Sequence, residues 1–180
     1  MITLSKNIQL QAISLNNHQK LVTLMHHIYP PAYKHLWKRE DCSWYLHKVY
    51  NYNSFELELE EFSSESYFIL FNDEIIGHLR LVFNTSFQDE QSYPSCYLQR
   101  LYLSEETQGI GIGTHILNWI ENRAKSKKNN LIWLESMDTQ TQSISFYQKQ
   151  GFTKSSHKRL DFKLMHKECR GMYIFFKKLE

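Results

Sequence analysis

The chain has 180 residues, of which 42% are hydrophobic, 14% aromatic and 22% charged, and its formal net charge is +2. This length suits one domain with a sizeable core better than two, and the balance of residue types is that of an ordinary globular protein. Because lysine and arginine are scattered instead of massed in one segment, the composition argues against a nucleic-acid partner.

Cysteines, histidines and apolar runs exclude further classes of protein. Cys42, Cys96 and Cys169 form no C-x-x-C pair, so neither a disulfide framework nor a zinc knuckle is indicated, which fits a reducing cytoplasm. The nine histidines form no H-E-x-x-H motif, and we expect no metal site. Residues 1–10 lack a signal-peptide block, and no apolar run approaches the roughly 18 residues that span a bilayer. A cytoplasmic protein without a membrane partner is expected.

The chain opens with a strand pattern followed by a helix pattern. Residues 8–13 alternate apolar and polar side chains at period two, which predicts a strand. Asn16-Asn17 is suited to cap a helix, which Pro30-Pro31 is expected to end. Helical spacing places four apolar side chains on one face of this helix: Leu21, Leu24, Met25 and Ile28.

Two short helices and a hairpin are predicted next. A helix is expected over residues 41–50. Residues 55–62 fit a short helix headed by Ser54, with acids near its positive end, although their strict alternation also permits a strand. Residues 67–71 and 75–83 read as two strands joined by a turn at 72–74, which predicts a hairpin.

The second half of the chain alternates strands and helices. Pro94 precedes the first of these strands, and Gly151 is a natural terminator for the second helix. Strand, helix, strand, helix and two strands are predicted over residues 96–103, 112–125, 131–134, 141–150, 152–154 and 171–177. This order predicts an α+β fold, a mixed sheet with helices packed on it, in a single domain over residues 1–180.

Three alternating glycines lie between a predicted strand and a predicted helix, in Gln108-Gly109-Ile110-Gly111-Ile112-Gly113. Glycines let the backbone approach a ligand, and unsatisfied amides at a helix N-terminus attract an anion such as pyrophosphate. A dinucleotide fingerprint would need glycine where Thr114 stands, and a P-loop would need a longer spacing and a lysine. A turn that only packs a helix against a strand is the alternative.

The loop resembles the Q/R-x-x-G-x-G/A acetyl-CoA motif of the GNAT N-acetyltransferase superfamily. Residues 100–103, Arg-Leu-Tyr-Leu, are similar to that family's central strand, and residues 145–152 resemble its second signature, a helix carrying Phe-Tyr and closing on Gly-Phe. The match is clear over about 96–152, and the layout most resembles bacterial polyamine (spermidine/spermine) N-acetyltransferases. The resemblance implies a mixed, mostly antiparallel sheet flanked by helices and splayed at the strand before the glycine loop.

The resemblance also implies where acetyl-CoA, the expected co-substrate, would bind. Main-chain amides of the loop would hold the pyrophosphate, so the identity of Ile110 or Ile112 should matter little, and the strand before it would pair with the pantetheine arm. Gln140 stands where many members have asparagine. The cofactor-binding residues expected on this basis are Leu101, Tyr102, Leu103, Gln108, Gly109, Ile110, Gly111, Ile112, Gly113, Thr114, Gln140 and Phe146.

Two tyrosines are the catalytic candidates that the resemblance implies. Tyr147 would donate a proton to the departing thiolate, unless it only packs beside its neighbour in the core. Tyr97 stands where some members carry a glutamate base, and this chain has no acid there. A water relay through Tyr97, Gln99 or His78 is one alternative, and Glu135 is another.

The expected acceptor is a primary amine, with a polyamine or another small amine as candidates. Residues 56–65 carry five glutamates that could hold extra ammonium groups or simply form a solvated surface. Aromatic side chains could hold a cation or belong to the core: Tyr29, Tyr33, Trp37 and Trp44. A coenzyme-binding regulatory module without catalysis and an enzyme acting on a peptide or protein amine are the alternatives, and a homodimer is an open possibility for its assembly.

Overall fold

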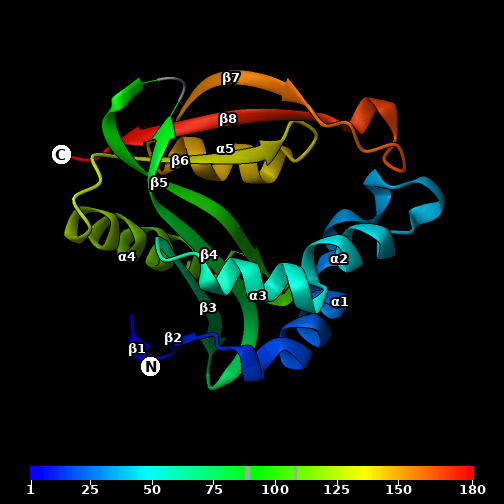
Figure 1. The fold of residues 1–180 in the computed structure, drawn as a ribbon, viewed down its shortest axis with the longest axis horizontal. Helices are drawn as coiled ribbons and strands as arrows, with labels where there is room; N and C mark the ends of the chain where they lie inside the picture. The colour runs from blue at the N-terminus through cyan, green and yellow to red at the C-terminus, as the bar shows by residue number, and fades with distance from the viewer. Residues whose placement is uncertain (88–89, 108) are drawn as a thin grey trace. The chain divides into compact units, whose positions relative to one another are not determined.

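The computed structural model describes residues 1–87, 90–107 and 109–180, with residues 90–93 described by their backbone alone (Figure 1). Its α-helices are α1 (His18–Tyr33), α2 (Ser43–Tyr50), α3 (Tyr52–Glu60), α4 (Ile112–Ser126) and α5 (Thr141–Lys149). Its strands are β1 (Ile2–Thr3), β2 (Ile8–Ala12), β3 (Ser64–Phe71), β4 (Glu74–Phe87), β5 (Glu90–Leu103), β6 (Leu131–Met137), β7 (Thr153–Arg159) and β8 (Gly171–Lys178).

The strands of the described residues form one sheet in the order β1-β2-β3-β4-β5-β6-β8-β7. Where the register is described, β5 and β6 are parallel, and the pairs β1–β2, β2–β3, β6–β8 and β7–β8 are antiparallel. The predicted mixed, mostly antiparallel sheet flanked by helices is therefore confirmed. In the same ranges, no helix is both long and apolar enough to cross a membrane.

The chain divides into two compact units, which we describe one at a time. Unit 1 holds Met1–Leu81 and Arg100–Trp119, and unit 2 holds Val82–Gln99 and Ile120–Glu180. The boundaries fall inside β4, β5 and α4. Unit 1 therefore carries the glycine loop, and unit 2 carries the Phe146-Tyr147 helix.

Helix α1 of unit 1 buries the four apolar side chains that helical spacing predicts. The prediction that Pro30-Pro31 ends this helix was wrong, because α1 continues to Tyr33 and the amide of Lys34 donates to the carbonyl of Pro30. A proline lacks an N–H donor but keeps its carbonyl as an acceptor, so it removes the bond to the preceding turn and still permits the next one. Helix α1 packs against α2, and α2 against α3.

Residues 52–60 of unit 1 form a helix, which decides between the two readings of this alternating segment. Asn51 caps α3, since its side-chain oxygen accepts from the amide of Ser54 at 3.0 Å. A local capping bond of this kind satisfies one of the unpaired amides of the first turn. The hairpin is confirmed as well, and Asn72 and Asp73 adopt the positive φ of a two-residue turn, 50° and 66°.

Unit 2 is built on β6, which pairs with β8 over its whole length and with β5 over Ser95–Leu98. Strand β5 begins at Glu90, earlier than predicted, and Pro94 lies within it. The carbonyl of Pro94 accepts from the amide of Asn130. Strand β7 is longer than predicted and almost fully exposed. Its polar side chains carry no apolar alternation, so the period-two signal could not reveal its extent.

Candidate functional site

The glycine loop of unit 1 needs its glycines for conformation and not for space. Gly109 and Gly111 have φ angles of 78° and 87°, in the left-handed region that favours glycine. A Cβ atom added at either would meet no atom within 4 Å. Gln108, the first residue of the motif, lies outside the described residues. The loop backbone is therefore open on the side where these side chains would project.

Helix α4 begins directly after this loop. The carbonyl of Gly111 accepts from the amides of Thr114 and His115, at 3.1 and 3.3 Å, which fixes the first turn. The amides of Ile112 and Gly113 precede any intrahelical acceptor and can serve an anion. Ile112 is only 1% exposed whereas Ile110 is 56% exposed, so the side chain of Ile112 does matter, as an anchor of the helix in the core.

Strand β5 leads into the loop and is held against β4. The amide of Ser104 donates to the carbonyl of Ile76 at 2.8 Å, and an added Cβ on Gly77 would lie 2.4 Å from the carbonyl oxygen of Tyr102. No side chain larger than hydrogen fits at that position without a shift of the backbone. The segment that contains Leu101, Tyr102 and Leu103 is thus rigidly supported from β4.

The side chain of Tyr102 joins three tyrosines of α1 and α2, and we call Tyr29, Tyr33, Tyr45 and Tyr102 the tyrosine cluster. Tyr29 stacks on Tyr33 and on Tyr45, with ring centroids 4.7 and 4.9 Å apart. Tyr102 meets Tyr29 and Tyr33 edge to face at 5.7 Å, and its hydroxyl oxygen lies 3.2 Å from that of Tyr45. Burial raises the pKa of Tyr33 to about 12, with a contribution from Tyr45.

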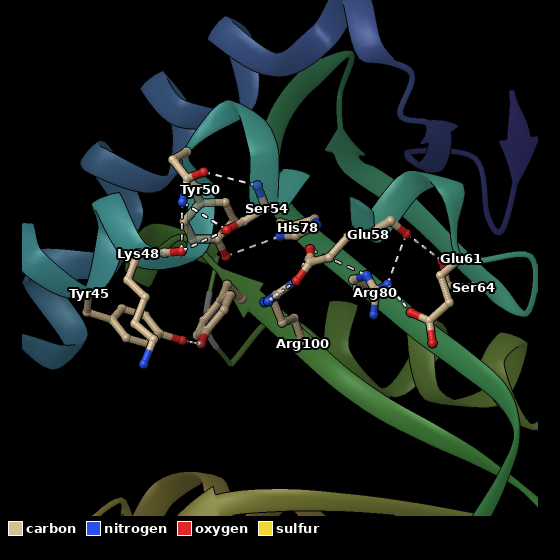
Figure 2. A network of polar contacts seen from close by, with 12 residues as sticks. Tyr45, Lys48, Tyr50, Ser54, Glu58, Glu61, Ser64, His78, Arg80 and Arg100 are labelled. Carbon is tan, nitrogen blue, oxygen red and sulfur yellow. Dashed lines mark hydrogen bonds and ion pairs between the residues drawn. The ribbon is translucent and has the colours of Figure 1, made fainter. Parts of the chain in front are cut away.

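A charged layer lies beside this cluster and joins α3 to the sheet (Figure 2). Both oxygens of Glu58 accept from the guanidinium of Arg100, at 2.6 and 2.7 Å. Arg80, whose side chain is 1% exposed, donates to the carboxylate of Glu61 at 2.6 Å and to the carbonyl of Glu58 at 3.0 Å. Two of the five glutamates of the acidic segment therefore neutralise internal arginines.

His78 is a buried histidine close to these ion pairs. Its Nδ1 lies 3.4 Å from the hydroxyl of Tyr50, as Figure 2 shows. Burial lowers the pKa of His78 well below its ordinary value of 6.5, and the charges of Arg100 and Arg80 lower it further. His78 is therefore neutral at physiological pH.

Unit 2 brings together two of the residues considered for the base. The hydroxyl of Tyr97 donates to Glu135 at 3.3 Å, and its ring stacks on Trp133 with centroids 3.8 Å apart. Lys158 of β7 donates to the other oxygen of Glu135. The sequence analysis missed Lys158, because β7 was predicted to end before it.

Tyr147 lies on α5 in a different setting of the same unit. Its ring is half-buried beside Phe146, Phe152 and Phe175, with centroids 5.3, 5.7 and 6.4 Å away. Phe175 pairs with Leu134, the neighbour of Glu135 on β6, and adjacent strand residues face opposite sides. Tyr147 therefore packs beside the face of the sheet opposite to that of Glu135.

Gln140 occupies the N-cap of α5. Its side chain makes no capping bond to the helix, while its main-chain carbonyl accepts from the amide of Ile144 at 3.0 Å. Within the ranges that the structure describes, no three His, Cys, Asp or Glu side chains cluster closely enough to hold a metal ion.

Comparison with known proteins identifies the family of this chain. The model of the acetyltransferase (GNAT) family matches residues 21–152. An uncharacterized N-acetyltransferase of Lactobacillus delbrueckii subsp. lactis, encoded in the pepI 3' region, is 24% identical over 117 residues, which are 65% of this chain and 68% of the relative.

Two solved structures illustrate the likeness of fold. The acetyltransferase from Salmonella typhimurium that modifies the N-terminal serine of ribosomal protein L7/L12 superposes with a TM-score of 0.72, at 15% identity, over 99% of both chains. The spermidine N-acetyltransferase from Vibrio cholerae, in complex with CoA and spermine, gives a TM-score of 0.69, at 12% identity, over 97% of both chains. At such identities the likeness extends to the fold alone.

Proposed function

The chain belongs to the acetyltransferase (GNAT) family, an acetyl-CoA-dependent enzyme family, and we propose that it transfers the acetyl group of acetyl-CoA to a small primary amine by direct attack. One observation carries this proposal. The glycine loop, with two backbone φ angles that favour glycine, opens helix α4 at the end of β5, inside the range that matches the family.

The coenzyme would be held by main-chain groups. In this proposal the first-turn amides of α4, those of Ile112 and Gly113 above all, donate to the pyrophosphate, which the helix dipole also attracts. The described pairing of β5 with β6 covers Ser95–Leu98. The backbone of Leu101 and Leu103 lies beyond that register and can pair with the amides of the pantetheine arm, as a further strand would.

Glu135 acts as the base in this mechanism, with Tyr97 as the relay. An amine is protonated near neutral pH and must lose a proton before its nitrogen can attack the thioester carbonyl. Tyr97 donates its hydroxyl proton toward Glu135, so its oxygen can accept a proton from the ammonium, directly or through water, as its own passes to the carboxylate. Lys158 donates to the other oxygen of Glu135 and holds the carboxylate in place.

Tyr147 acts as the acid that completes the reaction. Attack of the neutral amine forms a C–N bond, the C–S bond then breaks, and the coenzyme leaves as a thiolate. A tyrosine hydroxyl that donates to this thiolate stabilises it and yields the free thiol. The net products are the acetylated amine, the thiol of CoA and one proton released to solvent.

A panel of acceptors tests the proposal. The purified chain would be incubated with acetyl-CoA and diamines, amino acids or peptides with free N-termini, and thiol release and the acetylated product would be followed together. We expect turnover with small amines and loss of CoA binding in Gly111→Leu, whose side chain projects into the open side of the loop.

The opposite results would decide between the remaining alternatives. CoA binding without turnover on any amine would contradict the proposal and favour a regulatory module, and turnover on peptides alone would replace the small-amine acceptor. Unchanged CoA affinity in a folded Gly111→Leu variant would refute the assignment of the loop to the coenzyme.

A further inference from the structure

We propose that Lys177 of β8 is a positioning residue for the reaction, because it holds the C-terminal end of helix α5 and thereby sets the place of the Tyr147 hydroxyl. This inference rests on the proposed function, in which Tyr147 donates a proton to the departing thiolate. Every residue involved lies in unit 2, which includes β8, α5 and residues 120–126 of α4.

Lys177 joins three segments of unit 2 through one ammonium group. Its Nζ donates to the carboxylate of Glu121 on α4 at 2.6 Å and to the main-chain carbonyl of Gln150 at 2.9 Å. The side chains of Lys177 and Glu121 are 26% and 19% exposed, so salt and water screen this pair less than an exposed one. Gln150 is the C-cap of α5. The ammonium therefore ties the end of α5 to both β8 and α4.

Helix α5 has few other means of fixing its place. It has nine residues, fewer than the roughly 12 to 15 that make an isolated helix stable in water. The described residues of α5 include no fully buried side chain, and the side chain of Gln140 makes no capping bond at its N-terminal end. Contacts at the C-terminal end therefore carry much of the placement of this helix.

The last turn of α5 connects Lys177 to Tyr147. The amides of Gln150 and Phe152 both donate to the carbonyl of Tyr147, at 3.1 and 3.0 Å. The carbonyl of Gln150 in turn accepts from Lys177. A cation beside the last carbonyls of a helix also complements the helix dipole. Tyr147 is thus two hydrogen bonds and one residue away from the ammonium of Lys177.

The hydrocarbon stem of Lys177 lies along the same turn. Gly151, the residue after the C-cap, has a φ of 85°, in the left-handed region. A Cβ atom added to Gly151 would lie 3.5 Å from Cε and 3.9 Å from Cδ of Lys177. The stem therefore covers the turn that ends α5, while the ammonium at its tip makes the hydrogen bonds. A substitution that removes only the ammonium leaves this packing in place.

Strand β8 also provides a ring contact for Tyr147. Phe175 lies two residues before Lys177 and so on the same face of β8, with its ring centroid 6.4 Å from that of Tyr147. The ring contact restricts the direction of the phenol, and Lys177 fixes the helix that carries it. A proton donor must come within about 2.6–3.2 Å of the atom that it protonates, and a misplacement of about 1 Å can lower a rate about 10²-fold. The contact of Lys177 should therefore affect turnover more than substrate binding.

Lys177→Met, which keeps the stem and removes the ammonium, tests the proposal. We expect kcat for acetyl transfer to 1,4-diaminobutane to fall about 3- to 10-fold, and KM for both substrates to stay within about twofold of the wild type. Lys178→Met, at the exposed neighbouring lysine of the same strand, is the matched control for loss of a charge and should keep the wild-type kcat. An unchanged kcat in Lys177→Met, or an effect confined to KM, would overturn the proposal.

A double-variant cycle separates positioning from stability. If Lys177 acts through Tyr147, Lys177→Met should lower kcat no further in a Tyr147→Phe background. Glu121→Gln, which weakens the other contact of Lys177, should give a smaller fall with the same dependence on Tyr147, and it replaces Lys177→Met if circular dichroism shows that variant to be unfolded. An equal fall in both backgrounds would show a purely structural role and refute the proposal.

The same measurements distinguish this proposal from the function on which it rests. A wild-type kcat in Tyr147→Phe would remove Tyr147 as the acid and overturn the positioning role with it. An absence of turnover in the wild type would refute the acetyltransferase function itself. A loss of kcat in Tyr147→Phe without any in Lys177→Met would leave the function intact and refute Lys177 alone.

Discussion

Replacing Glu135 by glutamine removes the charge of the proposed base and keeps the size and one acceptor oxygen of the side chain. Tyr97 can still donate to the amide oxygen of the new side chain, and Trp133 still stacks on Tyr97, so the local packing is preserved. What is lost is the ion pair with Lys158 and the ability to take a proton. The substitution therefore separates catalysis from structure.

Glu135→Gln should change the stability of the protein little and its kcat/KM greatly. The side chain of Lys158 is 41% exposed, so the ion pair is worth about 0–1 kcal/mol, which shifts the melting temperature by only a few degrees. At pH 7 an amine of pKa about 10 is neutral in roughly one molecule per thousand. A base that removes this handicap contributes up to about 4 kcal/mol, so we expect kcat/KM to fall about 10²- to 10³-fold in Glu135→Gln.

The pH profile is the discriminating assay. Above pH 7 the solution supplies more neutral amine, so kcat/KM of Glu135→Gln should rise about tenfold per pH unit and approach the wild-type value near pH 10. Lys158→Met, which keeps the carboxylate, serves as the matched control and should lose far less activity. A Glu135→Gln enzyme within threefold of the wild type at pH 7, or a deficit that stays constant with pH, would refute Glu135 as the base.

Three further outcomes follow from unit 1. Gly77→Ala should lower the free energy of unfolding by about 1–3 kcal/mol in urea titrations, because its Cβ would lie 2.4 Å from a backbone oxygen. Gly109→Ala should lower it by only about 1 kcal/mol, the cost of a positive φ. Equal losses in the two variants would contradict the close approach of β4 to β5. Glu58→Gln leaves two buried arginines less well neutralised and should cost about 3 kcal/mol, and a loss below 1 kcal/mol would show that the ion pairs contribute little. Because the pKa of His78 is lowered in the native chain, the unfolded chain binds a proton below pH 6.5 that the native chain does not. The free energy of unfolding should therefore fall by up to about 1.4 kcal/mol for each pH unit below 6.5. His78→Asn should show a shallower fall between about pH 7 and 5, and an identical slope would contradict the buried neutral imidazole.

Much of the fold could be predicted from local patterns, because the apolar positions of a segment are the side chains that it buries in the core. The amphipathic spacing of α4 predicts a face that is fully buried, with Ile116, Leu117 and Ile120 at its centre. The patterns failed to predict the boundaries of elements where a proline lies inside a helix or a strand. Pro30 and Pro31 did not end α1, and Pro94 did not begin β5, because a proline removes one donor and leaves its acceptor in place.

The candidate site was only partly predictable, because side-chain partners come from distant segments. The glycine loop is contiguous in sequence, so its motif was visible. The contact between Tyr97 and Glu135 joins residues 38 positions apart and depends on the parallel register of β5 and β6. The acidic segment was read as a polyamine site or a solvated surface, but Glu58 and Glu61 bind arginines on β4 and β5, which no helical or strand period reveals.

Product stoichiometry tests the central claim most directly. The purified chain, incubated with acetyl-CoA and 1,4-diaminobutane, should release one CoA thiol for each N-acetylated diamine that mass spectrometry detects, and omission of the amine should reduce thiol release to the background rate of hydrolysis. Thiol release that is independent of the amine, or CoA binding with no acetylated product from any amine offered, would contradict acetyl transfer as the function of this chain.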